Sequence, residues 1–216
     1  MKNKGKYSTN GLIETEFEPG SGNRVLKNLL GVKSKRLMDN IESDALLEAE
    51  EKCIRLYSGN HHFTIKDICY NHHLFLGKIY PWAGKYRNVN LTKGSFTFAS
   101  ARHIPQLMTD FEKNFLHKYT PCNFKDREQV IGAIALVHTE LLLIHPFREG
   151  NGRLARLLAD LMALQSGLPT LDFGFVKGKT KLTYYQAVQQ GMRQDYEPMK
   201  RIIRRTIQRA LRRTEL

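Results

Sequence analysis

One stretch decides how this chain folds: His145-Pro-Phe-Arg-Glu-Gly-Asn-Gly-Arg-Leu-Ala-Arg156. Pro146 ends the helix that enters it, because a proline ring cannot continue the hydrogen-bond ladder and displaces the preceding residue from helical geometry. Gly150 and Gly152 flank Asn151, so the backbone can bend tightly and approach a ligand closely. A second helix begins at this bend. Apolar residues at helical spacing mark both helices: Val130, Ile134, Val137, Leu141 and Ile144 before the bend, and Leu154, Leu157, Leu158, Leu161 and Met162 after it.

The start of the second helix is a predicted phosphate site. Its first N–H groups have no intrahelical partner and carry the positive end of the helix dipole. Arg153 and Arg156 lie on one helix face, where guanidinium groups can bind phosphates bidentately. Glu149, the only carboxylate of the loop, suits Mg²⁺, and His145 is the only group there that accepts a proton near neutral pH. With Phe147 as an inward anchor, these parts predict transfer of a phosphorus-centred group to a hydroxyl.

The rest of the chain indicates an all-α domain that carries one short β-hairpin. Thr64 begins a capping box, Pro105 suits a first helical turn, and Asp126 is a helix cap. Between Lys85 and Ala99 the residues favour strands, with a turn at Lys93-Gly94. We expect an N-terminal arm over residues 1–33 and one domain over residues 34–216, with helices at 34–56, 64–77, 105–118, 126–144, 151–167, 182–193 and 197–213.

Composition narrows the class of protein. Among 216 residues, Lys and Arg outnumber Asp and Glu by 34 to 21, so the net charge of +13 attracts polyanions such as nucleic acid, an acidic protein or a nucleotide's phosphates. No apolar run is long enough to cross a bilayer, and the charged residues 1–6, with no apolar stretch after them, lead us to expect no secretory signal peptide. Three widely spaced cysteines indicate free thiols in a reducing compartment. We therefore expect a cytoplasmic protein, with export as an effector left open.

Several residues outside the stretch have simpler explanations. His138 lies on an apolar helical face and is expected to be a core histidine. The pairs His61-His62 and His72-His73 lack zinc-like partners and are expected to be structural or at the surface. The basic run from Lys200 to Arg213 has an apolar stripe, so a solvated helix face is favoured over a surface for nucleic acid or an acidic partner.

The stretch resembles the signature of the Fic (filamentation induced by cAMP) family, His-x-Phe-x-Asp/Glu-Gly-Asn-Gly-Arg-x-x-Arg, and matches it at every specified position. The upstream segment Tyr80-Pro-Trp-Ala-Gly-Lys-Tyr-Arg87 and the helical organisation extend the resemblance from Ser34 to the last helix. The resemblance implies a Mg²⁺-dependent enzyme that transfers AMP from ATP to a Tyr, Thr or Ser hydroxyl of a target protein and releases pyrophosphate.

The resemblance also implies a role for each residue of the signature. His145 would be the general base, Glu149 would ligate Mg²⁺, Arg153 would hold the β-phosphate and Arg156 the γ-phosphate. Backbone N–H groups and the Asn151 side chain would face phosphate oxygens. The anion hole would comprise Gly150, Asn151 and Gly152, with Pro146 and Phe147 structural. The flap that binds the target as an added strand would comprise Asn90, Leu91, Thr92, Lys93, Gly94, Ser95, Phe96, Thr97 and Phe98.

Two further features bear on the reaction and its control. A related phosphorylating enzyme has Lys at the position of Gly152, so glycine favours AMP transfer over a kinase-type phosphotransferase. No Ser or Thr is followed four residues later by Glu, the pattern of the family's inhibitory helix. This points to inhibition by a separate small antitoxin protein, with a constitutively active effector as the less favoured alternative. Self-modification and a nucleic-acid-binding regulator with a degenerate nucleotide site also remain as alternatives.

Overall fold

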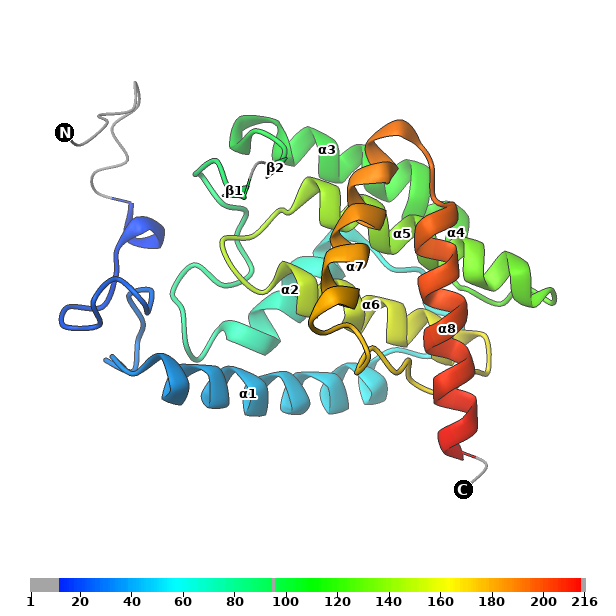
Figure 1. The fold of residues 1–216 in the computed structure, drawn as a ribbon, viewed down its shortest axis with the longest axis horizontal. Coiled ribbons are helices and arrows are strands. Elements are labelled where there is room, and N and C mark those ends of the chain that lie inside the picture. The colour runs from blue at the N-terminus through cyan, green and yellow to red at the C-terminus, as the bar shows by residue number, and fades with distance from the viewer. Residues whose placement is uncertain (1–11, 95, 215–216) are drawn as a thin grey trace.

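Helices make up most of the computed structural model, which describes residues 12–94 and 96–214 (Figure 1). The predicted all-α fold with one hairpin is confirmed. The α-helices are α1 (Lys35–Leu56), α2 (Ile65–Leu76), α3 (Ile104–Phe111), α4 (His117–Tyr119), α5 (Arg127–Ile144), α6 (Asn151–Gln165), α7 (Lys179–Gln190) and α8 (Glu197–Thr214). The strands are β1 (Thr92–Lys93) and β2 (Phe96–Thr97). Short 3₁₀ turns occur at Ile13–Thr15, Ala101–His103 and Gly191–Arg193, and a π-helical turn, Glu112–Leu116, joins α3 to α4.

Local capping signals set several helix boundaries. The Ser34 side chain accepts from the N–H of Leu37 at the start of α1. Thr64 and Asp67 form the predicted capping box of α2, and the Asp126 side chain accepts from the first turn of α5. The helix predicted from Pro105 continues to residue 119 but widens into the π-helical turn on the way, and α7 begins three residues earlier than expected.

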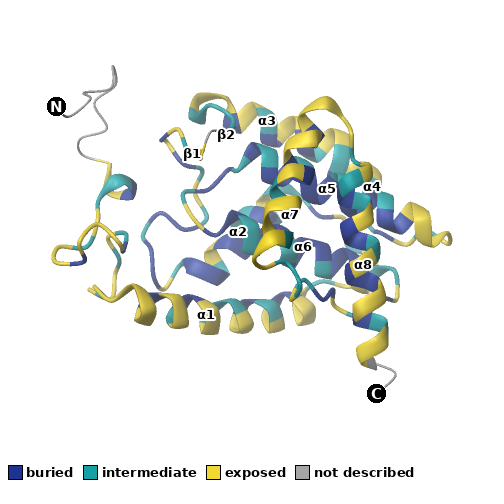
Figure 2. Ribbon diagram, in the orientation of Figure 1, coloured by how far each residue is buried: buried dark blue, intermediate teal, exposed yellow. Residues whose placement is uncertain are grey.

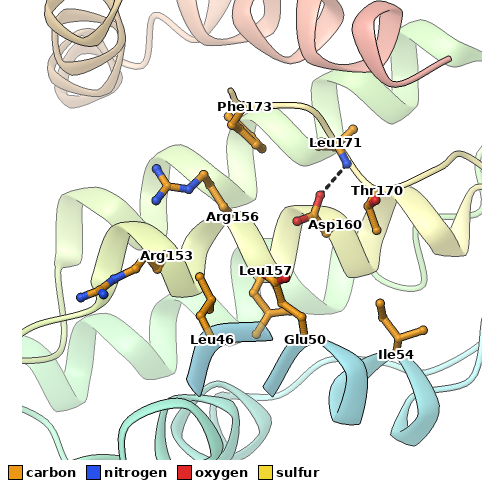
Figure 3. Close-up of a pocket in the computed structure, with 10 residues that line it drawn as sticks. All are labelled: Leu46, Glu50, Ile54, Arg153, Arg156, Leu157, Asp160, Thr170, Leu171 and Phe173. Carbon is orange, nitrogen blue, oxygen red and sulfur yellow. Dashed lines mark hydrogen bonds between the residues drawn. The ribbon is translucent and has the colours of Figure 1, made fainter. Parts of the chain in front are cut away.

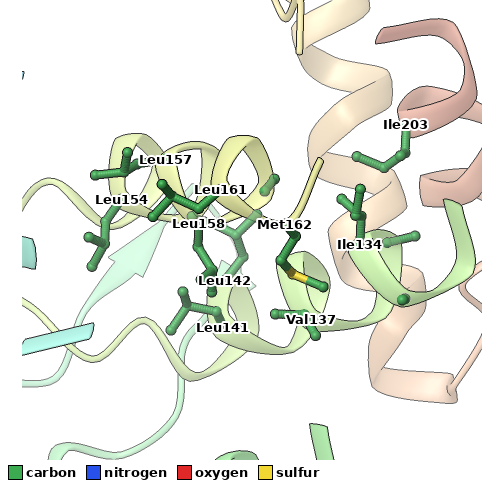
Figure 4. Close-up of a cluster of buried hydrophobic side chains, with 14 of the residues drawn as sticks. Ile134, Val137, Leu141, Leu142, Leu154, Leu157, Leu158, Leu161, Met162 and Ile203 are labelled. Carbon is green, nitrogen blue, oxygen red and sulfur yellow. The ribbon is translucent and has the colours of Figure 1, made fainter. Parts of the chain in front are cut away.

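The main core surrounds α5, which packs against α3, α6, α7 and α8. Figure 4 shows apolar side chains of α5 and α6 meeting between the two helices, with Ile203 of α8 beside them. Both helices are largely buried, whereas α1 exposes its outer face (Figure 2). His138 is fully enclosed, with Nδ1 3.0 Å from the Ala155 carbonyl oxygen and Nε2 2.7 Å from the Tyr184 hydroxyl. The prediction of a core histidine is confirmed.

The hairpin is shorter than the strand-forming residues suggested. β1 pairs antiparallel with β2, with Thr92 opposite Thr97 and Lys93 opposite Phe96. Tyr86 and Val89 lie outside both strands. The backbone upstream of β1 forms hydrogen bonds outside the hairpin, since the N–H of Arg87 donates to the Pro146 carbonyl 2.9 Å away. The predicted flap residue Ser95 lies outside the described residues.

The described part of the N-terminal arm, residues 12–33, is fastened to the helical body at several points. Val25 is buried, and the N–H of Leu29 donates to the Ile79 carbonyl oxygen at 2.8 Å. Arg148 Nε donates to the carbonyl oxygen of Glu14, also at 2.8 Å. The arm therefore reaches the loop that the sequence singled out.

Some of the basic residues of α8 form ion pairs with other parts of the domain. Arg204 forms an ion pair with Glu128 of α5, and Arg209 forms one with the buried carboxylate of Asp172. The apolar side of the helix buries residues such as Ile203 and Ile207. All three cysteines are free, as expected. No helix within the described ranges has the length and apolar character needed to cross a membrane.

We predict that Leu158→Ala lowers the free energy of unfolding by about 2–5 kcal/mol, because truncation leaves a cavity between α5 and α6. Leu158 is 2% exposed, whereas Leu164 on the same helix is 36% exposed. Leu164→Ala is the matched control and should cost about 0.5 kcal/mol or less in urea denaturation. Equal losses from the two substitutions would contradict the assigned packing of α6.

Candidate active site

A cleft of about 720 Å³ gathers residues from the arm, α1, the hairpin, α6 and α7 around the central loop. It brings together most of the residues that the sequence nominated. The cleft is lined by His145, Glu149, Gly150, Asn151, Gly152, Arg153 and Arg156, and by the hairpin residues Leu91, Thr92, Lys93, Phe96 and Phe98. Pro146 and Phe147 lie buried behind it, as expected of structural residues.

His145 follows the last residue of α5 in a left-handed conformation, with φ 53° and ψ 59°. This conformation turns its side chain out of the helix and into the cleft. Its Nδ1 lies 3.2 Å from the Leu142 carbonyl oxygen. A carbonyl only accepts hydrogen bonds, so we assign the imidazole proton to Nδ1, which leaves the Nε2 lone pair free. The ring of Phe98 stacks on the imidazole at 3.8 Å.

The environment keeps this imidazole uncharged. Burial lowers the pKa of His145 to about 4, and the positive charges of Arg87 and Lys93 act in the same direction. The Leu142 carbonyl and the Glu149 carboxylate oppose the shift but do not outweigh burial. His145 is therefore neutral at physiological pH, which is the state that can accept a proton.

Phe147 anchors the loop to the core. Its side chain is fully buried and stacks on His72 with ring centroids 3.8 Å apart. The Asn151 side chain closes the loop, since its Oδ1 accepts from the Phe147 N–H at 2.9 Å and its Nδ2 donates to the Phe147 carbonyl at 2.7 Å. This differs from the expectation that the Asn151 side chain faces phosphate. Its carboxamide is engaged by the backbone of the loop instead.

Glycine is favoured at positions 150 and 152 for different physical reasons. Gly150 has φ +82°, and a Cβ there would lie 2.9 Å from Leu76 Cδ1. A Cβ on Gly152 would meet no atom within 4 Å, although the residue lines the cleft. Gly150 takes the N-cap position of α6, where no side chain caps the helix. The N-terminal turn of α6 therefore presents N–H groups and open space to a ligand.

Arg153 is held in place from three sides. Its Nη1 forms an ion pair with Glu42 of α1 at 2.6 Å, and its Nη2 lies 3.5 Å from Glu149. Its guanidinium also lies 4.9 Å from the centre of the Phe75 ring. Glu42 is buried and accepts a hydrogen bond from the Tyr80 hydroxyl at 2.6 Å. No local sequence pattern predicted the role of Glu42, because its pairing with Arg153 joins elements far apart in the chain.

Arg156 differs from Arg153 in its partners. It is half-buried in the cleft wall, and across residues 12–94 and 96–214 no carboxylate forms an ion pair with it. Of the nearby carboxylates, Glu50 has its pKa raised by burial, and the charge of Arg156 lowers that pKa only in part. Arg156 thus remains available to an anionic ligand.

A second cavity of about 260 Å³ lies behind the arginines, between α1, α6 and residues 170–173 (Figure 3). Asp160 accepts a hydrogen bond from the N–H of Leu171 at 2.6 Å, and burial raises the pKa of Asp160 to about 7. This contact holds the segment after α6 against the helix. Glu50 and Asp160 line this cavity together with Arg156, and burial raises the pKa of both carboxyl groups.

The hairpin is joined to the cleft wall opposite. Lys93 Nζ lies 2.9 Å from the Tyr185 hydroxyl of α7 and over the Tyr185 ring. Tyr184, Tyr185 and Val188 of α7 line the cleft on this side. The cleft therefore has Arg153 and Arg156 at its α6 end, and aromatic rings accompanied by Lys93 at the end between the hairpin and α7. No sequence pattern indicated this contribution of α7, because its residues lie outside the signature.

Comparison with known proteins places this geometry in a family. The Fic/DOC family model matches residues 62–163, a range that includes the entire signature. The chain is 27% identical to "Protein adenylyltransferase Fic" of Nematostella vectensis over 210 residues, which are 95% of this chain and 47% of that protein. It is 29% identical to "Protein adenylyltransferase VbhT" of Bartonella schoenbuchensis over 151 residues, which are 69% of this chain and 30% of that protein. The chain thus spans less than half of the length of these curated relatives.

Solved structures share the fold. The BepC effector protein of Bartonella tribocorum, solved with bound AMPPNP, superposes with a TM-score of 0.72 at 21% identity and covers 91% of this chain and 97% of its own. A Fic domain from Bartonella quintana with bound ADP gives a TM-score of 0.69 at 24% identity, covering 88% and 92%. The complete signature and the matching family model together show that residues 62–163 of this chain form a Fic/DOC family domain, and the solved structures share its helical fold.

Proposed function

We propose that this chain is a protein adenylyltransferase, which transfers AMP from ATP to a Tyr, Thr or Ser hydroxyl of another protein. The observation that carries the proposal is the pairing of a neutral imidazole, with Nε2 free, and a helix N-terminus flanked by two arginines in one cleft. The names of the relatives support it, since they are protein adenylyltransferases.

ATP fits the two ends of the cleft. The phosphates would lie at the first turn of α6, near Arg153 and Arg156, where the helix dipole and the guanidinium charges both stabilise anions. The nucleoside would lie toward Tyr185 and Val188 of α7, which offer aromatic and apolar surface. This placement puts the α-phosphate between the two ends, on the side of the cleft where His145 lies.

The transfer then needs one proton acceptor and one stabilised leaving group. His145 Nε2 takes the proton from the target hydroxyl, and the hydroxyl oxygen forms a bond to the α-phosphorus. The bond from the α-phosphorus to the bridging oxygen of the β-phosphate breaks, and pyrophosphate leaves. Arg153, Arg156 and the N–H groups of α6 stabilise the negative charge that accumulates on the departing phosphates.

Glu149 would hold a Mg²⁺ ion beside the phosphates of the bound nucleotide. Its side chain is 48% exposed in the cleft, and only Oε1 is engaged, by the N–H of Gly150 and by Arg153. In the described part of the chain no group of three potential metal ligands occurs, which suits Mg²⁺ because this ion completes its shell with phosphate oxygens and water. When bound, the ion would neutralise phosphate charge and polarise the α-phosphate.

The hairpin would bind the target as an added strand. Both strands are two residues long, and within residues 12–94 and 96–214 they pair only with each other. Thr92 and Thr97 are exposed, so an extended peptide can reach the hairpin edge. Because Phe98 stacks on His145, a peptide docked on this edge would deliver its hydroxyl beside the base.

Control by a separate small protein also fits the site. Arg156 has no ion-pair partner among the described residues, so a carboxylate from an inhibitor could occupy it and exclude the phosphate tail. This inhibitor would act as an antitoxin in trans. Self-modification of the chain would use the same cleft and is detected by the labelling experiment below.

The proposed activity is tested with ATP labelled at either the α- or the γ-phosphate, incubated with Mg²⁺, the full chain and a cell lysate. We expect label on protein from the α position only, and none with His145→Ala, which removes the base without touching the core. Label from the γ position alone would establish the kinase-type alternative. Absence of both labels, together with salt-sensitive DNA binding, would establish the nucleic-acid-binding regulator.

The two glycines provide a matched pair of variants. Gly152→Ala should leave the free energy of unfolding unchanged but weaken ATP binding about tenfold or more, because its Cβ enters the space predicted for phosphate. Gly150→Ala should instead lower the free energy of unfolding by about 1–3 kcal/mol, since it combines positive φ with a clash at Leu76. Urea denaturation and calorimetric titration with ATP measure both. Unchanged ATP affinity in a folded Gly152→Ala protein would refute the phosphate position.

The lowered pKa of His145 predicts the acid limb of the pH–rate profile. Above a pH of about 4 the imidazole is neutral and can accept a proton, and activity falls as the pH drops through that value. We therefore expect kcat/KM to stay constant from pH 7 to about pH 5, with protein stability followed in parallel. An acid limb near the ordinary histidine pKa of 6.5 would show that the base is solvated or is another residue.

A further inference from the structure

Arg87 is a buried guanidinium that the signature does not include. It is 1% exposed and is among the largest fully buried side chains of the described residues. Nε donates to the carbonyl oxygen of His145 at 2.8 Å, and Nη2 lies 2.7 Å from the carbonyl of Ala99 and 3.4 Å from that of Ile144. Nη1 donates to the carbonyl of Val89 at 2.5 Å. One planar side chain thus binds four backbone carbonyl oxygens.

The burial of this charge needs an explanation, because arginine is almost never fully buried without an ionic partner. Arg87 forms no ion pair with any described carboxylate, and Glu14 is the carboxylate whose charge acts on it. Its compensation comes from the C-terminus of α5, where the carbonyls of Ile144 and His145 carry the negative end of the helix dipole. Arg87 is therefore a cap for α5 in addition to a cross-link.

The four carbonyls belong to two separate functional parts. Ile144 and His145 form the junction between α5 and the loop that carries the base. Val89 precedes β1 and Ala99 follows β2, so they are the two ends of the hairpin. The backbone N–H of Arg87 adds a fifth link, to the carbonyl of Pro146 at 2.9 Å.

We propose that Arg87 is a positioning residue for the transfer reaction, which fixes the His145 loop and the base of the hairpin in a single frame. The proposal rests on the proposed function, in which the hairpin delivers the target hydroxyl and His145 removes its proton. Arg87 touches neither reactant. It sets the distance between the two elements that do, and a guanidinium can do this because its donors diverge in one plane.

If Arg87 has this role, its replacement should lower the rate of AMP transfer without lowering the affinity for ATP. The proposed phosphate site lies at the N-terminus of α6, and within the described part of the chain the Arg87 guanidinium donates to other segments and not to that turn. Displacing the hairpin from His145 by about 1 Å can cost on the order of a hundredfold in rate, because transfer requires a short and aligned approach. The affinity for ATP should not fall with the transfer rate, because the groups proposed to bind ATP are not displaced.

The test uses the full chain with Arg87→Lys and Arg87→Ala, and with Arg204→Lys as a control on α8. We expect the rate constant for AMP transfer from saturating α-labelled ATP to lysate acceptors to fall about 10- to 100-fold in the Arg87 variants. The Kd and stoichiometry of ATP binding should stay within about twofold of wild type. Millimolar guanidinium should restore part of the rate of Arg87→Ala, and Arg204→Lys should match wild type.

Three results would overturn the proposal: an unchanged transfer rate in Arg87→Lys and Arg87→Ala, a loss of ATP-binding sites that accounts for the loss of rate, or unchanged hairpin exchange. Hydrogen exchange supplies this last readout without any activity. The amide of Phe98, which donates to the Leu91 carbonyl, should exchange at least about tenfold faster in both Arg87 variants, while amides of α6 stay protected. This measurement still decides the role of Arg87 if wild-type protein transfers no AMP.

Discussion

The clasp between the Asn151 carboxamide and the backbone of Phe147 is the interaction on which the site depends. It binds both the N–H and the carbonyl of Phe147, and so closes the loop that begins at His145 and ends at the first turn of α6. Phe147 itself stacks on His72, whose Nε2 lies 3.0 Å from the Glu149 carbonyl oxygen. These contacts hold His145, on one side of the loop, and the N-terminus of α6, on the other side, in fixed positions relative to each other. Preorganised catalysis requires such fixed positions.

The polar side chains around this loop differ in their charge and in their partners. Burial keeps His145 uncharged, and it outweighs the nearby carboxylate of Glu149. Arg153 contacts Glu42, Glu149 and the Phe75 ring, and these partners fix the direction of its side chain. Arg156 lacks an ion-pair partner among the described residues, so a phosphate tail has least competition there. An anion entering the cleft therefore meets one oriented and one unpaired cation, without displacing the proton acceptor.

How much of this could be predicted from the sequence depends on the range of each interaction. Caps such as Thr64, the helix-ending Pro146 and the glycines act within a few residues, so the pattern of letters around them predicts the structure. Glu42 and Arg87 act on residues more than fifty positions away, and nothing in their local sequence predicts a partner. For Asn151 the sequence predicted which residue matters but not what its side chain binds. Its position was predicted from the signature, but whether its carboxamide would bind a ligand or the loop depends on the backbone path.

The described residues of the hairpin and its ends contact the cleft region in three places. Its ends bind Arg87, Phe98 lies on the imidazole of His145, and Lys93 reaches Tyr185 on the wall proposed for the nucleoside. A two-residue strand pair has too few hydrogen bonds of its own to hold a position. Its position must therefore come from these three contacts. A target peptide that adds a strand to this hairpin would consequently be aligned by the side chains that hold the hairpin beside the base, so substrate alignment depends on contacts made outside the strand pair itself.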